Sequence, residues 1–76
     1  MTDLSPFERA VLTELAEAGG EAPGDLALAL EADLQRVFAT VGALRRRGLV
    51  ARDGLDTCRL TERGREVAAT GAAPAR

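Results

Sequence analysis

Arginine is the residue type with which this chain could bind a charged partner, and its arginines gather in one part of the sequence. All ten basic residues are arginine, and nine of them follow residue 35. Residues 1–35 carry one arginine and eight acidic residues, a net charge of −7, whereas residues 36–76 carry nine arginines and four acidic residues, a net charge of +5. This polarity lets one face of a domain attract phosphate groups while the other repels them. Alternatively, the two halves neutralise each other through surface ion pairs worth about 0–1 kcal/mol each.

The densest group of arginines, at 45–47, closes a segment whose apolar residues predict an α-helix over 34–47. These apolar residues recur at intervals of three, four and three, as on one side of a helix: Leu34, Val37, Val41 and Leu44. Asp33 stands where a side chain accepts the free amide hydrogens of a helix start. The arginines stand where the helix dipole favours cations, and Gly48 supplies a left-handed cap. Such a helix is typical of the DNA-reading part of a helix-turn-helix, which is our leading hypothesis.

The remaining elements are predicted from caps, turns and apolar spacing. Ser5 and Glu8 form a capping box with proline between them at the first helical position. Thr61 caps the last helix and Gly71 ends it. The predicted order is a helix up to Gly19-Gly20, a connection at 21–24, a helix over 25–30, a turn at 31–33, the helix over 34–47, strands at 49–52 and 57–60 around a turn at 53–56, and a helix over 62–70. This order predicts one domain at residues 1–70, followed by a disordered tail at 71–76.

Two short motifs in this order resemble a known family. The run Leu44-x-x-x-Gly48-Leu49-Val50, then a hairpin, then Leu60-Thr61-x-x-Gly64, is similar to the winged helix-turn-helix domain of MarR-type and PadR-type bacterial regulators. The resemblance covers about residues 5–70. It implies a mostly α fold with a small β-hairpin: a three-helix core, a two-stranded wing and a C-terminal helix. It also implies a transcriptional regulator that binds double-stranded DNA, as a homodimer, with its third helix in the major groove.

Carried over to this sequence, the resemblance assigns two kinds of DNA contact. Arginine and glutamine side chains can bind guanine and adenine edges, with about 1–3 kcal/mol of discrimination for each good pair. The base-reading residues would lie early in the third helix: Gln35, Arg36, Ala39 and Thr40. The phosphate contacts would come from the wing and from one or two residues of the trio at the helix end: Arg52, Arg59, Arg45, Arg46 and Arg47.

Leu34 and Phe38 leave a second function open. They flank the expected reading face, where the family usually shows small polar residues. If both are buried, the helix is simply wider on its core side. If both are exposed, they form an apolar patch that suits a protein partner. The alternative function is therefore a winged-helix protein–protein interaction module that does not bind DNA.

Two other features depart from a standard DNA-binding surface. Asp53 and Asp56 make the hairpin tip acidic, so its insertion between phosphates of the minor groove is disfavoured. Gly42 lies in mid-helix, where glycine costs about 1 kcal/mol relative to alanine. Close packing against a neighbouring helix is the ordinary explanation for such a glycine.

Other function classes find little support in the sequence. There is no histidine, and the single cysteine, Cys58, has no partner for a disulfide, a metal site or nucleophilic catalysis. A lone cysteine in a strand is usually a small buried hydrophobic residue. No glycine-rich nucleotide motif and no apolar run of membrane-spanning length is present. We therefore expect a cytoplasmic protein that is not an enzyme, with no cofactor, metal, membrane association or evident small-molecule ligand.

Overall fold

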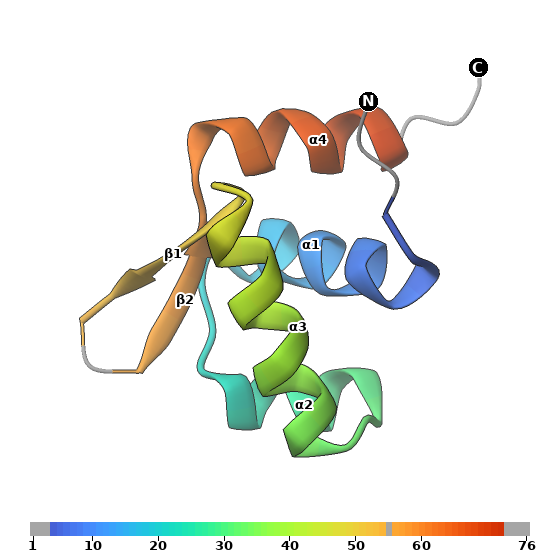
Figure 1. Ribbon diagram of the computed structural model, residues 1–76, viewed down its shortest axis with the longest axis vertical. Helices are drawn as coiled ribbons and strands as arrows, with labels where there is room; N and C mark the ends of the chain where they lie inside the picture. The colour runs from blue at the N-terminus through green and yellow to red at the C-terminus, as the bar shows by residue number, and fades with distance from the viewer. Residues whose placement is uncertain (1–3, 55, 73–76) are drawn as a thin grey trace.

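The computed structural model of the chain describes residues 4–54 and 56–72. The elements follow one another as α1 (Pro6–Ala18), α2 (Pro23–Leu30), α3 (Leu34–Arg46), β1 (Val50–Asp53), β2 (Thr57–Leu60) and α4 (Glu62–Ala72) (Figure 1). The predicted order of three helices, a hairpin and a further helix is confirmed. In the part of the chain that is described, no helix is both long and apolar enough to cross a membrane.

Helix α1 begins and ends as its sequence predicts. The Ser5 hydroxyl accepts a hydrogen bond from the amide of Glu8 (3.1 Å), and the Glu8 carboxylate accepts one from the amide of Ser5 (2.8 Å). These reciprocal bonds satisfy two amide hydrogens that an α-helix leaves without partners. Gly19 caps the other end in the left-handed conformation, with φ of 78°. Local sequence therefore defines both ends of this helix.

The boundaries of α2 and α3 correct three details of the prediction. Helix α2 begins at Pro23, two residues before the predicted start, because proline is tolerated in a first helical turn. Asp33 is the N-cap residue of α3, but its side chain makes no capping hydrogen bond. Helix α3 ends at Arg46, and Arg47 is its C-cap residue. Gly48 follows with φ of 78°, as predicted for a left-handed cap.

The second half of the chain corrects two more boundaries. Strand β1 is shifted by one residue relative to the prediction, since it runs from Val50 to Asp53. Helix α4 continues to Ala72, so Gly71 does not end it as predicted. A glycine in a helical turn costs only about 1 kcal/mol, which the neighbouring turns can offset. The rest of the predicted tail, at 73–76, lies outside the described residues.

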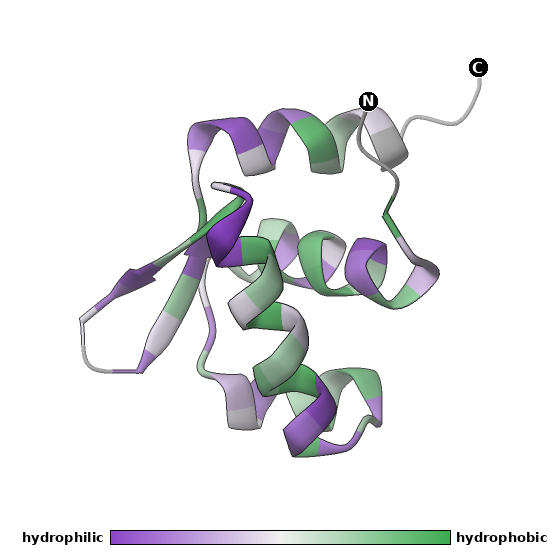
Figure 2. Cartoon of the chain, viewed as in Figure 1, coloured by the Kyte–Doolittle hydropathy of each residue, from purple (hydrophilic) through white to green (hydrophobic). Residues whose placement is uncertain are grey.

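One apolar core joins all four helices to the hairpin. Its buried members come from every element: Val11, Leu12, Leu15, Leu26, Val37, Val41, Leu44, Leu49, Val50, Cys58, Leu60 and Ala68. Figure 2 shows β1 turning from hydrophobic where it leaves the core to hydrophilic toward the turn. Cys58 is buried in this core, as the sequence analysis expected of a lone strand cysteine. The core thus leaves one side of α3 and the outer half of the hairpin at the surface.

Strand β2 has pairing partners on both of its sides. It pairs antiparallel with β1, with Val50 opposite Leu60 and Arg52 opposite Cys58. On its other side, Cys58 forms a bridge with Glu21, through amide-to-carbonyl bonds of 2.8 and 2.9 Å. The sequence analysis treated Glu21 only as part of a connection and did not predict this bridge. It fastens the hairpin to the segment between α1 and α2.

The start of α4 is fixed to the chain that leaves α3. The Thr61 hydroxyl donates a hydrogen bond to the carbonyl of Gly48 (2.7 Å) and accepts one from the amide of Gly64 (3.0 Å). The amide of Thr61 donates to the carbonyl of Leu49 (3.0 Å). A Cβ atom on Gly64 would overlap that same Leu49 carbonyl, so a side chain has no room there. The two motifs that carry the family resemblance are therefore in direct contact.

Candidate nucleic-acid interface

The outward face of α3 is the first part of the candidate site. A helix turns by about 100° per residue, so residues at 35, 39, 42 and 46 form a stripe opposite the buried Val37, Val41 and Leu44. Gln35, Ala39 and Arg46 are exposed along this stripe. Thr40 is half-buried and lies nearer the core. The stripe therefore has an amide group at its start, no large side chain in its middle and a guanidinium group at its end.

One flank of α3 lies against the start of α1. The guanidinium carbon of Arg36 lies 4.1 Å from the centroid of the Phe7 ring, which is a cation–π distance. Nη1 of Arg47 lies 3.7 Å from Oε1 of Glu8, the oxygen that also accepts from the Ser5 amide. Arg36 is thus oriented by an aromatic ring, and the charge of Arg47 is partly offset by a carboxylate. The sequence analysis assigned no role at this site to Phe7 or Glu8.

The other flank of α3 faces the hairpin, where the charges of two arginines affect the pKa of the Cys58 thiol. Burial raises the pKa of the Cys58 thiol, the positive charges of Arg52 and Arg45 oppose that rise, and the negative charge of Asp56 adds to it. Charges of both signs, from the end of α3 and from the hairpin, therefore lie within electrostatic range of Cys58.

Arg59 is oriented by an acidic neighbour on the paired strand. Its Nε atom lies 3.6 Å from Oδ2 of Asp53, and both side chains are more than half exposed. An exposed ion pair of this length is weak, so a phosphate group can compete with Asp53 for the guanidinium. Asp53 thus lies within β1 beside an arginine, and not at a bare acidic tip.

The predicted basic residues thus lie in two groups on opposite flanks of α3. Arg36 and Arg47 lie on the α1 side, whereas Arg45 lies on the opposite flank, which faces the hairpin. Arg46 lies between the two groups, on the outward stripe. The resemblance assigned Arg36 to base edges and one or two of the trio at 45–47 to phosphates, but it did not predict on which flank of the helix each arginine lies. Their division follows from helix geometry, because residues nine apart on an α-helix point about 180° from each other.

The sequence did not determine whether Leu34 and Phe38 are buried or exposed, and the structure shows that both are exposed. Leu34 is 43% exposed and Phe38 is 55% exposed, so neither belongs to the core.

Gly42 lies close by on the outward stripe, and the close packing against a neighbouring helix that the sequence predicted for it is absent. A Cβ atom on Gly42 would have only Nη1 of Arg46 near it, at 3.9 Å. Because no neighbouring helix in the described residues packs on Gly42, the middle of α3 is accessible to a binding partner.

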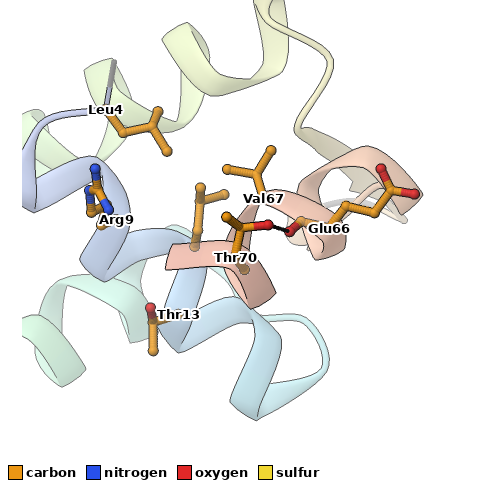
Figure 3. A pocket seen from close by; sticks show the side chains of 8 residues that line it. Leu4, Arg9, Thr13, Glu66, Val67 and Thr70 are labelled. Atoms are coloured by element: carbon orange, nitrogen blue, oxygen red, sulfur yellow. Dashed lines mark hydrogen bonds between the residues drawn. The ribbon is translucent and has the colours of Figure 1, made fainter. Parts of the chain in front are cut away.

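A cavity of about 450 Å³ lies on another side of the molecule, between α1 and α4 (Figure 3). Its lining is part apolar and part polar: Leu4, Arg9, Leu12, Thr13, Glu66, Val67, Ala68 and Thr70. The Thr70 hydroxyl donates to the carbonyl of Glu66 (2.9 Å), which is drawn as the dashed line in Figure 3. No local pattern in the sequence predicts this cavity, because its walls come from the two ends of the chain. Within the described residues, no cluster of histidine, cysteine or acidic side chains suits a metal ion.

The combination of a helix-turn-helix, a two-stranded wing and a following helix defines a winged helix-turn-helix domain. Comparison with solved structures supports this class and refines it. The reduced form of MarR from E. coli superposes with a TM-score of 0.86 at 24% sequence identity, over 90% of this chain and 51% of that chain. A MarR family protein from Mycobacterium tuberculosis gives 0.84 at 30% identity, over 92% of this chain and 53% of that one. The chain therefore has a winged helix-turn-helix fold that is similar to these MarR structures.

A third similar structure is a mutant of E. coli MarR in complex with operator DNA. Its TM-score is 0.81 at 23% identity, over 90% of this chain and 53% of that chain. The present chain therefore spans about half the length of the MarR proteins that it matches. No protein-family model matches the chain, and the search of curated proteins finds no match.

Proposed function

We propose that this domain binds double-stranded DNA and acts as a transcriptional regulator, with α3 in the major groove and the hairpin beside it. The observation that carries the proposal is the outward stripe of α3, which is open and leads from Gln35 to Arg46, with the exposed Arg45 beside it in the last turn of the helix. An α-helix fits the major groove of B-DNA, and arginines beside it can bind the flanking phosphates. The operator complex of a similar MarR protein supports the same use of the fold.

The proposal gives different roles to the outward stripe and its flanks. Gln35 and Ala39 would face base edges, together with Arg36, whose direction is set by Phe7, whereas Thr40 lies nearer the core. The arginines near the helix end and on the hairpin would bind phosphates: Arg45, Arg46, Arg47, Arg52 and Arg59. Arg47 and Arg59 would exchange their carboxylate partners, Glu8 and Asp53, for phosphate oxygens on binding. This exchange costs little, because surface ion pairs are worth about 0–1 kcal/mol.

We further propose that the protein works as a homodimer in the cytoplasm and has no catalytic role. One domain of this size makes few base contacts, and a two-fold pair reads two half-sites one helical turn apart. Sedimentation equilibrium on the whole chain, in the presence of a bound duplex, tests this stoichiometry. Two chains for each duplex support the proposal, whereas one chain for each duplex contradicts it.

A salt titration tests DNA binding itself. A random duplex library is selected for binding to the 76-residue chain at low salt, and the affinity of the selected duplex is measured at rising salt. We expect a linear fall of log affinity with log salt concentration, because each neutralised phosphate releases condensed counterions. If no duplex is enriched and none binds at low salt, the proposed function is wrong.

Single variants then separate phosphate binding from base recognition. Arg46→Ala and Arg59→Ala should each weaken binding to all sequences alike and reduce the salt slope by about one. Arg36→Ala should instead relax the sequence preference. Arg63→Ala is the matched control, because Arg63 is an exposed arginine of α4, which packs on α1 and β2. An equal effect of Arg63→Ala would show that only total charge matters.

A further inference from the structure

The exposed apolar side chains on α3 are not explained by the fold or by phosphate binding. Phe38 is 55% exposed and Leu34 is 43% exposed, although large apolar residues normally gain free energy from burial. They lie four residues apart, on the same flank of the helix as Arg45, which follows Phe38 by seven residues. The pair therefore lies between the outward stripe and the hairpin side of α3. Any ligand of the stripe would meet it.

The outward stripe beside Phe38 has few groups that could hydrogen-bond to bases. Ala39 offers only a methyl group, and Gly42 has no side chain, with only Nη1 of Arg46 within 4 Å of where its Cβ atom would be. The middle of α3 can therefore approach a surface closely but cannot donate hydrogen bonds from side chains there. In the major groove, the one apolar group on a base edge is the 5-methyl group of thymine. Phenylalanine and alanine side chains can contact it.

We propose that Phe38, supported by Leu34, contacts thymine methyl groups in the major groove and gives this domain a preference for A·T pairs beneath the middle of α3. The proposal rests on the proposed DNA-binding function. It makes Phe38 a specificity-determining residue, whereas Arg45 and Arg46 on the following turns supply attraction to phosphates. Because Ala39 has a small side chain and Gly42 has none, the helix can approach the groove closely enough for Phe38 to reach the base edge.

The size of the apolar patch argues against a protein as its occupant. Two partly exposed side chains offer roughly 200 Å² of apolar surface, whereas a stable protein interface buries about 800 Å² on each partner. Arginines follow the patch along the helix, where they can bind the phosphate groups that flank a major groove. A duplex needs only a methyl-sized contact at this place and suits the charged border.

Replacement of thymine by deoxyuridine tests the proposal, because the two bases differ only by the methyl group. Each thymine of the selected duplex is replaced in turn, in both half-sites, and affinity for the whole chain is measured. We expect one or two positions at which affinity falls about fourfold for each methyl removed, the value of one buried methyl group. Phe38→Ala should bind the thymine duplex more weakly and should no longer distinguish it from the deoxyuridine duplex.

Two further variants control for shape and for general apolarity. Phe38→Leu keeps an apolar side chain and should keep part of the thymine preference. Leu28→Ala removes an apolar side chain that is 78% exposed on α2 and should leave the preference unchanged. Circular dichroism checks that each variant folds. If the duplex binds with the expected salt dependence but every deoxyuridine is tolerated, the thymine contact is wrong and DNA binding stands. If no duplex binds, both proposals fail, and Phe38 becomes a candidate for protein contact.

Discussion

Gly42 and Gly64 both lie within helices, yet the structure requires only one of them. A Cβ atom on Gly64 would overlap the carbonyl of Leu49, because α4 lies directly on the chain that leaves α3. A Cβ atom on Gly42 would meet only the end of the Arg46 side chain. Folding therefore fixes the residue type at the junction of α3, β1 and α4, and leaves the outward middle of α3 free. A free position that still carries glycine, at a cost in helix stability, is available for contact with a partner.

Gly64→Ala should have the largest effect, because backbone atoms cannot yield as the end of a side chain can. We expect a loss of about 3 kcal/mol in the free energy of unfolding, at the upper end of the usual cost of overpacking. Urea unfolding followed by circular dichroism measures it. A loss below about 1 kcal/mol would show that α4 does not approach Leu49 so closely.

Thr61→Val tests the same junction through its hydrogen bonds. The variant keeps the shape of the side chain but removes the cap on Gly64 and the bond to the Gly48 carbonyl. We expect a loss of about 1–2 kcal/mol, as for other N-cap residues. Thr61→Ser keeps the hydroxyl and should lose much less. Equal losses in the two variants would mean that the hydroxyl does not hold the junction.

Gly42→Ala should act in the opposite direction. Alanine fits the space, and the helix should gain up to about 1 kcal/mol because alanine has the higher helix propensity. The same urea measurement reports the gain. Destabilisation would show that the fold requires glycine at position 42 as it does at position 64, which would contradict the comparison.

Arg47→Ala should have the smallest effect and should differ from the junction variants in its response to salt. The ion pair with Glu8 is partly exposed, so its loss should cost less than about 1 kcal/mol. Thermal melts of variant and wild type at low salt and in 1 M NaCl measure it, and the difference should shrink at high salt. A large, salt-independent loss would assign Arg47 to the core of the fold.

The sequence predicted most of the fold because its decisive signals are local. The capping box of Ser5 and Glu8 and the apolar spacing of α3 need only neighbouring residues to be recognised. Gly42 misled the prediction, because a mid-helix glycine shows a cost but not its cause. Gly71 also misled the prediction, because a single glycine is a weak signal for the end of a helix and α4 continues past it.

The candidate site was less predictable, because its partners come from distant parts of the chain. Phe7 and Glu8 lie almost thirty and forty residues before Arg36 and Arg47, and nothing in the local sequence pairs them. Phe38 lies about 100° from the centre of the buried stripe, where apolar spacing cannot separate core from surface. The assignment of each arginine to bases or phosphates stays a prediction.

The bridge between Glu21 and Cys58 has a consequence for how copies of this domain can associate. The bridge occupies the amide and carbonyl of Cys58 on the outer side of β2, so a further strand cannot pair continuously along that edge. The other edge of the hairpin is β1, which is four residues long and ends in Arg52 and Asp53. Short, charged edges discourage the addition of a strand from a neighbouring molecule. Both edges of the hairpin therefore disfavour pairing with a strand of another copy.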